Sequence, residues 1–172
     1  MGKHELVDLV NENGEIVRTA VPRVEAEALN GEELHIPIIG CVILNSIGEV
    51  LVHERAAGKR FAGSLDHVYG AISSGETPEQ AGERECGEEL GVKPQTITRV
   101  REGLNAYNYY QYLFAVITDD IPQNISQREV AWAKYMNTDL LMSSQNDGTY
   151  TFTHNFFADM NAVLSHQTKS AK

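Results

Sequence analysis

The chain is poor in cysteine and in long apolar runs, and each shortage excludes a class of protein. Only two cysteines occur in 172 residues, Cys41 and Cys86, and neither belongs to a CxxC pair. Two such residues cannot form the disulfide framework of a small secreted domain. No apolar run approaches the roughly 20 residues that a membrane-spanning helix needs. The first residues carry acids where a signal peptide is apolar. We therefore expect a cytoplasmic protein with reduced thiols and no membrane partner.

Positive charge is also scarce. Lys and Arg together number 14 against 24 Asp and Glu, which gives a formal net charge of −10. Phosphate backbones select basic surfaces, so this balance argues against a nucleic-acid partner. It leaves room for a small phosphorylated ligand, because a metal ion can bridge phosphates to local carboxylates.

Turn signals and alternating patterns predict the strands. The pair Asn13-Gly14 separates two alternating runs, which predicts a β-hairpin near the N-terminus. A second hairpin is predicted over 36–56. Single strands rich in β-branched and aromatic residues are predicted over 106–118 and 130–136. The glycine-rich segment 56–68 is predicted to be a loop.

Capping residues and apolar periodicity predict the helices. A capping-box pattern at Thr77 begins one helix, and Thr153 is expected to cap a final helix with one apolar face. A short helix or turn is expected over 24–34 and a frayed tail over 166–172. Strands interleaved with two main helices predict an α/β/α sandwich around a mixed sheet. We expect a single domain over residues 1–172, with the N-terminal hairpin and short helix as an extension.

The helix after Thr77 carries an unusual group of acids. Glu85, Glu88 and Glu89 share one side of the helical wheel. Like charges at such spacings repel by roughly 0.2–0.5 kcal/mol per pair. One reading is a solvated acidic face. The other is a site for Mg²⁺ or Mn²⁺, which prefer carboxylate oxygens and often bind substrate phosphates as well.

The spacing around these acids resembles a known signature. From Gly70 to Val92 the sequence GAISSGETPEQAGERECGEELGV follows the Nudix box, G-x5-E-x7-R-E-U-x-E-E-x-G-U, where U is a bulky apolar residue. The one small departure is Cys86 at the first U position. The chain therefore resembles the Nudix hydrolase superfamily, and the resemblance implies a Nudix α/β/α sandwich over most of its length.

The resemblance implies a metal centre. Glu85, Glu88 and Glu89 would be metal ligands, one of them serving as or orienting the general base, and the Gly70 carbonyl would be a further ligand. The cofactor would be Mg²⁺ or Mn²⁺. The implied chemistry is attack by water on phosphorus within a diphosphate, because metal ions neutralise phosphate charge and lower the pKa of bound water.

Other positions would support that centre. Arg84 would hold the carboxylates by charge-assisted hydrogen bonds and take part in catalysis. Glu76 would brace the loop–helix junction, and Gly91 would end the helix. Nudix enzymes often carry one more metal-binding or basic glutamate outside the box. Glu129 is the candidate here, and Glu102 is the alternative.

The segment before the box resembles the isopentenyl-diphosphate isomerase-like branch of the superfamily. That resemblance implies that Arg55 and Lys59 contact the substrate diphosphate. The Cys and His that the isomerase uses are replaced here by Tyr69 and Ala71, which favours hydrolysis over isomerisation. Tyr69 also stands where hydrolases usually have Gly, so we expect it to narrow or redirect the substrate cleft.

The aromatic strand offers a further substrate contact. Tyr107, Tyr109 and Gln111 share one face of the predicted strand, and Tyr110 and Tyr112 share the other. One face is expected in the core, whereas the other is a candidate lining of the cleft, where Tyr109 would stack on a base.

These observations predict a Mg²⁺-dependent hydrolase that cleaves the pyrophosphate linkage of a nucleoside diphosphate derivative or a related diphosphate. The alternatives are an isopentenyl-diphosphate isomerase-like enzyme and a non-catalytic nucleotide-binding module. Nudix relatives are often dimers, which implies a homodimer by analogy alone.

Overall fold

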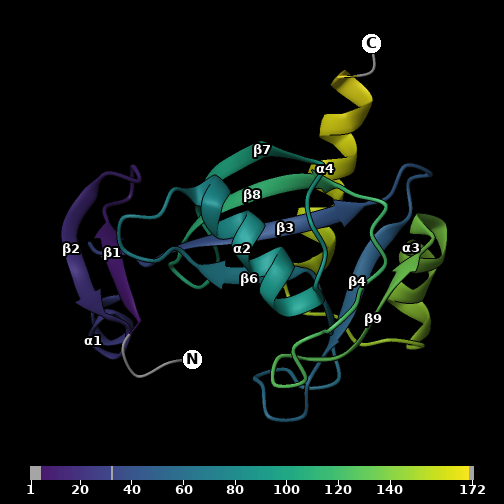
Figure 1. Ribbon diagram of the computed structural model, residues 1–172, viewed down its shortest axis with the longest axis horizontal. Helices are drawn as coiled ribbons and strands as arrows, with labels where there is room; N and C mark the ends of the chain where they lie inside the picture. The colour runs from purple at the N-terminus through teal and green to yellow at the C-terminus, as the bar shows by residue number, and fades with distance from the viewer. Residues whose placement is uncertain (1–4, 32, 171–172) are drawn as a thin grey trace.

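A mixed β-sheet runs through the middle of the molecule (Figure 1). In the computed structural model, which describes residues 5–31 and 33–170, seven strands form this sheet. They are β3 (Pro37–Leu44), β4 (Val50–Arg55), β5 (Leu65–Asp66), β6 (Val68–Ala71), β7 (Thr96–Leu104), β8 (Tyr110–Ile117) and β9 (Val130–Met136). The order along the sheet is β5–β4–β3–β8–β7, with β6 also paired to β3 and β9 to β4. β3 and β8 are parallel, whereas β4, β5, β6, β7 and β9 each have an antiparallel neighbour.

Helices cover both faces of the sheet. α2 (Pro78–Leu90) lies on one face, and α3 (Thr138–Asp147) and α4 (Phe156–Ser170) lie on the other. Successive residues of a strand point to opposite faces. Cys41 of β3 accordingly shares a buried cluster with Cys86 of α2, whereas Val42 shares one with Met160 of α4. The predicted α/β/α sandwich with a mixed sheet is confirmed.

The N-terminal segment forms a small unit of its own. β1 (Leu6–Val10) and β2 (Ile16–Pro22) make a separate two-stranded sheet, followed by α1 (Arg23–Leu29), at one side of the main sheet (Figure 1). The buried side chains that join this unit to the main body are Val7, Leu9, Val21, Ala26, Ile36 and Ala71. The predicted hairpin and short helix are therefore present. Residues 1–4 of the predicted extension lie outside the described residues.

The predicted strand over 106–118 is wrong at its start, because β8 begins at Tyr110. The Asn105 side chain accepts hydrogen bonds from the backbone N–H groups of Tyr107 (2.9 Å) and Tyr109 (3.2 Å). These bonds fold the residues before β8 into a turn. Tyr107 and Tyr109 therefore do not share a strand face with Gln111.

Three elements do not follow from the sequence pattern. The segment 56–68, predicted to be a loop, contains the short strand β5. β7, with the sequence TITRVREGL, is mostly polar and charged, so its alternation carries no apolar signal. α3 is capped by Asn137, but its residues TDLLMSSQND form only a weak apolar face. Tertiary packing decides these elements rather than local pattern.

The C-terminal prediction also needs correction. Thr153 does not cap the final helix, because its side chain donates a hydrogen bond to Asp66 (2.6 Å) and α4 begins at Phe156. The tail predicted to be frayed is helical as far as Ser170, and residues 171–172 lie outside the described residues. No helix in the described ranges is long and apolar enough to span a bilayer.

Candidate active site

The segment from Gly70 to Val92 folds as the end of a strand, a loop and a helix. β6 ends at Ala71, and Thr77 begins α2 with both hydrogen bonds of the capping box to Gln80. At the other end Gly91 has a left-handed φ of 64°. A Cβ at Gly91 would lie 1.7 Å from the carbonyl oxygen of Gln123, so only glycine fits there. The structure places Gly91 where the sequence predicts the end of the helix.

Arg84 is the hub of the box. Its Nε and Nη2 atoms donate to the two oxygens of Glu76 at 2.8 and 2.9 Å. Its Nη1 atom donates to Glu85 at 2.7 Å and to Glu88 at 3.3 Å. Nη2 also reaches the carbonyl oxygen of Ala71 at 3.0 Å. One guanidinium thus ties the end of β6 to three carboxylates.

Glu89 is the carboxylate that Arg84 does not reach. Its Oε2 atom is buried and has no hydrogen-bond partner within the described part of the chain. Burial raises the pKa of Glu89 well above its usual range, and the charges of Glu85 and Glu129 raise it further. Burial likewise raises the pKa of Glu85. Buried acids without a compensating charge are costly for the folded protein.

The residues present fit a divalent cation. Within residues 5–31 and 33–170 no three His, Cys, Asp or Glu side chains are already arranged to hold a metal ion, and Glu85 and Glu88 pair with Arg84. The unpaired Glu89 oxygen nevertheless lies in a group of acids whose charge a hard cation would compensate. The Glu85 carboxyl also packs so closely on Gly70 that a Cβ there would fill its place. This donor set suits Mg²⁺ or Mn²⁺ with substrate and water oxygens as further ligands.

A cavity of about 470 Å³ opens over these carboxylates, and we call it the carboxylate cavity. Glu129 and Lys59, which the sequence predicts as site residues, line it and form an ion pair with each other. The lining also includes residues that the sequence reasoning missed, namely Glu5, Arg23, Ser126 and Arg128. Adjacency to Glu129 was a usable signal for Arg128. Nothing in the sequence pointed to Glu5 or Arg23.

Glu102, the alternative to Glu129, lies elsewhere. It is on β7, where it accepts a hydrogen bond from Arg99 at 2.7 Å and contacts Tyr110. It lines a separate cavity with Arg101 and Gln111. The structure therefore brings Glu129, and not Glu102, to the carboxylates.

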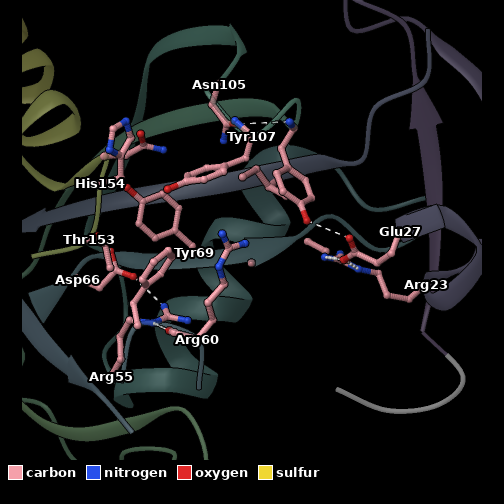
Figure 2. A pocket seen from close by; sticks show the side chains of 16 residues that line it. Arg23, Glu27, Arg55, Arg60, Asp66, Tyr69, Asn105, Tyr107, Thr153 and His154 are labelled. Carbon is pink, nitrogen blue, oxygen red and sulfur yellow. Dashed lines mark hydrogen bonds and ion pairs between the residues drawn. The ribbon is translucent and has the colours of Figure 1, made fainter. Parts of the chain in front are cut away.

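A second cavity, of about 310 Å³, adjoins the first, and we call it the aromatic cavity (Figure 2). Arg60 lies over the rings of Phe61 and Tyr107, 4.7 and 5.3 Å from their centroids. The His154 ring meets Tyr107 edge-on at 5.9 Å. Tyr109 also lines the cavity, and its hydroxyl group donates to Glu27 of the N-terminal extension at 2.9 Å. Flat rings beside a guanidinium can stack on a ligand ring.

Arg55 and Tyr69 form walls of this second space. Arg55 lines the aromatic cavity, where its Nη1 donates to Asp66 at 2.7 Å and its Nε to the carbonyl of Arg60 at 2.8 Å. Tyr69 is in the lining of both cavities, and its hydroxyl donates to the fully buried Asp159 at 2.6 Å. Tyr69 therefore stands at the boundary between the cavities with its hydroxyl turned into the core.

Comparisons with known proteins agree with this geometry. A family model of the NUDIX domain matches residues 34–157. The chain is similar to an uncharacterized Nudix hydrolase of Listeria monocytogenes, 30% identical over 174 residues that cover 92% of this chain and 97% of the relative. It is also similar to an RNA pyrophosphohydrolase of Aeromonas hydrophila, 36% identical over 93 residues that cover 54% of this chain and 51% of that protein.

The fold is shared with solved structures. A crystal structure of DR0079 from Deinococcus radiodurans is similar with a TM-score of 0.74 and 23% identity, over 92% of this chain and 99% of that one. This likeness concerns the fold alone. With the matched domain, the full-length relative and the carboxylate helix taken together, the chain belongs to the Nudix hydrolase family.

Proposed function

We propose that the protein is a Mg²⁺-dependent hydrolase, also served by Mn²⁺, that cleaves the pyrophosphate linkage of a nucleoside diphosphate derivative. The observation that carries the proposal is the adjacency of the two cavities. They share Arg23, Tyr69, Gly70 and Ala71 in their linings. A diphosphate in the carboxylate cavity would therefore place an attached ring system in the aromatic cavity.

The roles of the residues follow from their positions. Glu85, Glu88, Glu89 and the Gly70 carbonyl would hold the cation, with Glu129 as a further ligand or base. When bound, the cation would neutralise phosphate charge and lower the pKa of a water molecule. Water would attack phosphorus and break one P–O bond of the linkage, with its proton passing to one of the carboxylates. The name of the Aeromonas relative, a pyrophosphohydrolase, supports this reaction class.

Several cations and rings would bind the substrate. Lys59 lines the carboxylate cavity and Arg55 the aromatic cavity, so these two predicted residues would contact the phosphates from opposite sides. Tyr69 and Tyr109 would bound the attached group. The comparisons give no support to the narrower isopentenyl-diphosphate isomerase-like branch, and Tyr69 and Ala71 occupy the positions of its Cys and His.

The decisive experiment is a substrate panel with Mg²⁺ and Mn²⁺. Nucleoside diphosphates, sugar nucleotides, dinucleotides and isopentenyl diphosphate would be assayed with the wild-type protein and with Glu89→Gln and Glu88→Gln. We expect hydrolysis of a nucleoside diphosphate derivative that both variants lose while remaining folded. Glu83→Gln, an exposed acid of the same helix, serves as the matched control.

Each other outcome has a distinct meaning. Full turnover by Glu89→Gln would refute the metal site. Allylic product from isopentenyl diphosphate would favour the isomerase alternative, and a wholly inert panel would favour the binding module. The cytoplasmic location and the homodimer stay predictions. Light scattering of the purified protein would test the dimer.

A further inference from the structure

Arg23 belongs to the N-terminal extension and yet lines both cavities. It is the first residue of α1, and it lies before the matched NUDIX domain at 34–157. Figure 2 shows its side chain, with that of Glu27, reaching toward the aromatic cavity from the extension. The site is therefore built from two parts of the chain, of which only one is the NUDIX domain.

The guanidinium of Arg23 is held in a fixed position. Its Nε and Nη2 atoms pair with one oxygen of Glu27 at 2.8 and 2.7 Å. The other oxygen of Glu27 accepts a hydrogen bond from the Tyr109 hydroxyl at 2.9 Å. The Arg23 backbone N–H also donates to the carbonyl of Glu5 at 2.8 Å. Glu27 of the extension, itself held by Tyr109 from the turn before β8, thus sets the orientation of the Arg23 side chain.

One nitrogen of the Arg23 guanidinium, Nη1, has no acceptor among the described residues. Only 11% of the Arg23 side chain is exposed. Its Nη1 atom is buried and finds no hydrogen-bond partner among the residues that the structure describes. A buried charged donor without an acceptor is unfavourable. Because the Arg23 side chain is part of the lining of both cavities, a ligand bound there can supply the acceptor that the protein does not.

The chemistry of the missing acceptor can be narrowed. A guanidinium fork matches the oxygens of a phosphate. Lys59 pairs with Glu129, Arg55 with Asp66 and Arg23 with Glu27. Of these three cations, Arg23 is the one with a buried nitrogen that has no partner among the described residues. Arg23 sits where the carboxylate cavity meets the aromatic cavity. The expected acceptor is therefore a phosphate oxygen at the junction between a diphosphate and a nucleoside.

We propose that Arg23 is a substrate-binding residue, whose Nη1 donates to the phosphate next to the nucleoside of a nucleoside diphosphate derivative. The N-terminal extension is then part of the substrate site. This inference rests on the proposed function for the class of substrate. It adds the residue that joins the two halves of the ligand and a binding role for a segment outside the NUDIX domain.

The test is equilibrium binding of ADP by calorimetry with Mg²⁺ present, in the form of its non-hydrolysable α,β-methylene analogue, with adenosine as the second probe. Arg23→Gln should weaken ADP binding roughly tenfold or more, which is the value of a hydrogen bond to a charged group. Adenosine binding should be unchanged, since it lacks the phosphate. Arg23→Lys, which keeps the charge and loses the fork, should give a smaller loss and covers the case that Arg23→Gln does not fold.

The matched control is Arg18→Gln, an exposed cation on β2 of the same extension. It should bind ADP like the wild-type protein. Equal ADP affinity in the wild type, Arg23→Gln and Arg23→Lys would overturn the proposal. An equal loss for ADP and adenosine would also overturn it, because Arg23 would then only support the cavity wall. Failure of the proposed function would appear differently, as turnover that survives Glu89→Gln.

Discussion

The carboxyl group of Glu85 packs directly on the backbone of Gly70. A Cβ at position 70 would lie 2.1 Å from the Glu85 carboxyl carbon, far inside any allowed contact. Glu85 cannot simply move aside, because Arg84 holds it by a 2.7 Å hydrogen bond. β6 and α2 can therefore pack this closely only because Gly70 has no side chain.

Gly70→Ala should therefore disable the enzyme more than it destabilises the fold. Displacing the Glu85 carboxylate by about 1 Å is expected to lower turnover by about 100-fold. Gly87→Ala is the matched control, since a Cβ on this exposed glycine of α2 meets no described atom within 4 Å. Steady-state kinetics on the hydrolysed substrate would check both variants. Wild-type turnover in Gly70→Ala would show that Glu85 can shift without loss.

Glu89→Gln should stabilise the protein in EDTA while abolishing turnover. The raised pKa of Glu89 means that the folded state disfavours its ionised form, and the amide removes this cost. We expect a gain in the free energy of unfolding, because burial and the charges of Glu85 and Glu129 all disfavour the carboxylate at this position. Urea unfolding with and without Mg²⁺ would measure it. Mg²⁺ should stabilise the wild type more than the variant. Unchanged or lower stability of Glu89→Gln in EDTA would contradict the prediction.

Tyr69→Phe should lower the free energy of unfolding and leave the shape of the cavity unchanged. The lost hydroxyl leaves the buried Asp159 with fewer donors, Gln111 at 2.7 Å and Arg101. The expected loss in unfolding free energy is about 1–3 kcal/mol, while the ring stays in the cavity wall. Tyr109→Phe is the control, because its hydroxyl bond to Glu27 is solvent-exposed and should contribute less. Equal losses in both variants would mean that the buried Tyr69–Asp159 hydrogen bond contributes no more to stability than the exposed Tyr109–Glu27 bond.

Buried His67 should make stability depend on pH. Its ring stacks on Phe156 at 4.2 Å, and its Nε2–H donates to the Phe156 carbonyl at 3.2 Å. Burial lowers the pKa of His67 from 6.5 to about 4, opposed by the charge of Asp159. Between these values the unfolded chain binds more protons than the folded one. The stabilisation is therefore present above pH 6.5 and is lost as the pH falls toward 4.

At pH 5 this loss amounts to about 2 kcal/mol from His67 alone. Other buried acids also titrate, so the quantity to measure is a difference between proteins. Urea unfolding at pH 7.5 and pH 5.0 should show that the stability advantage of the wild type over His67→Gln shrinks by that amount at the lower pH. A constant difference at the two pH values would count against a neutral, buried His67.

The site was predictable to the extent that it is local in the chain. The spacing from Gly70 to Val92 predicts the helix, its cap at Thr77 and the group of three glutamates, and the structure places them together. Contacts between distant segments were not predictable. Glu27 binds both Arg23 and Tyr109, although Glu27 and Tyr109 are 82 residues apart in the sequence, and no local pattern predicts this contact. The sequence pattern also did not predict the polar strand β7 or the turn before β8. Tertiary contacts decide the strand, and the Asn105 side chain decides the turn.

The separate buried cluster beneath β1, β2 and α1 has an implication for how such a site diversifies. The carboxylates belong to a helix that packs on the main sheet, whereas Glu27 belongs to a small unit whose buried cluster also includes Ile36 and Ala71 of the main body. Substitutions in that unit would alter the wall of the aromatic cavity, while the buried cluster beneath α2 keeps its own residues. The proposed ligand wall and the acids that would hold the cation therefore stand on different buried clusters, and hydrogen bonds such as Tyr109 to Glu27 and Ser74 to Asp8 connect the two parts of the chain.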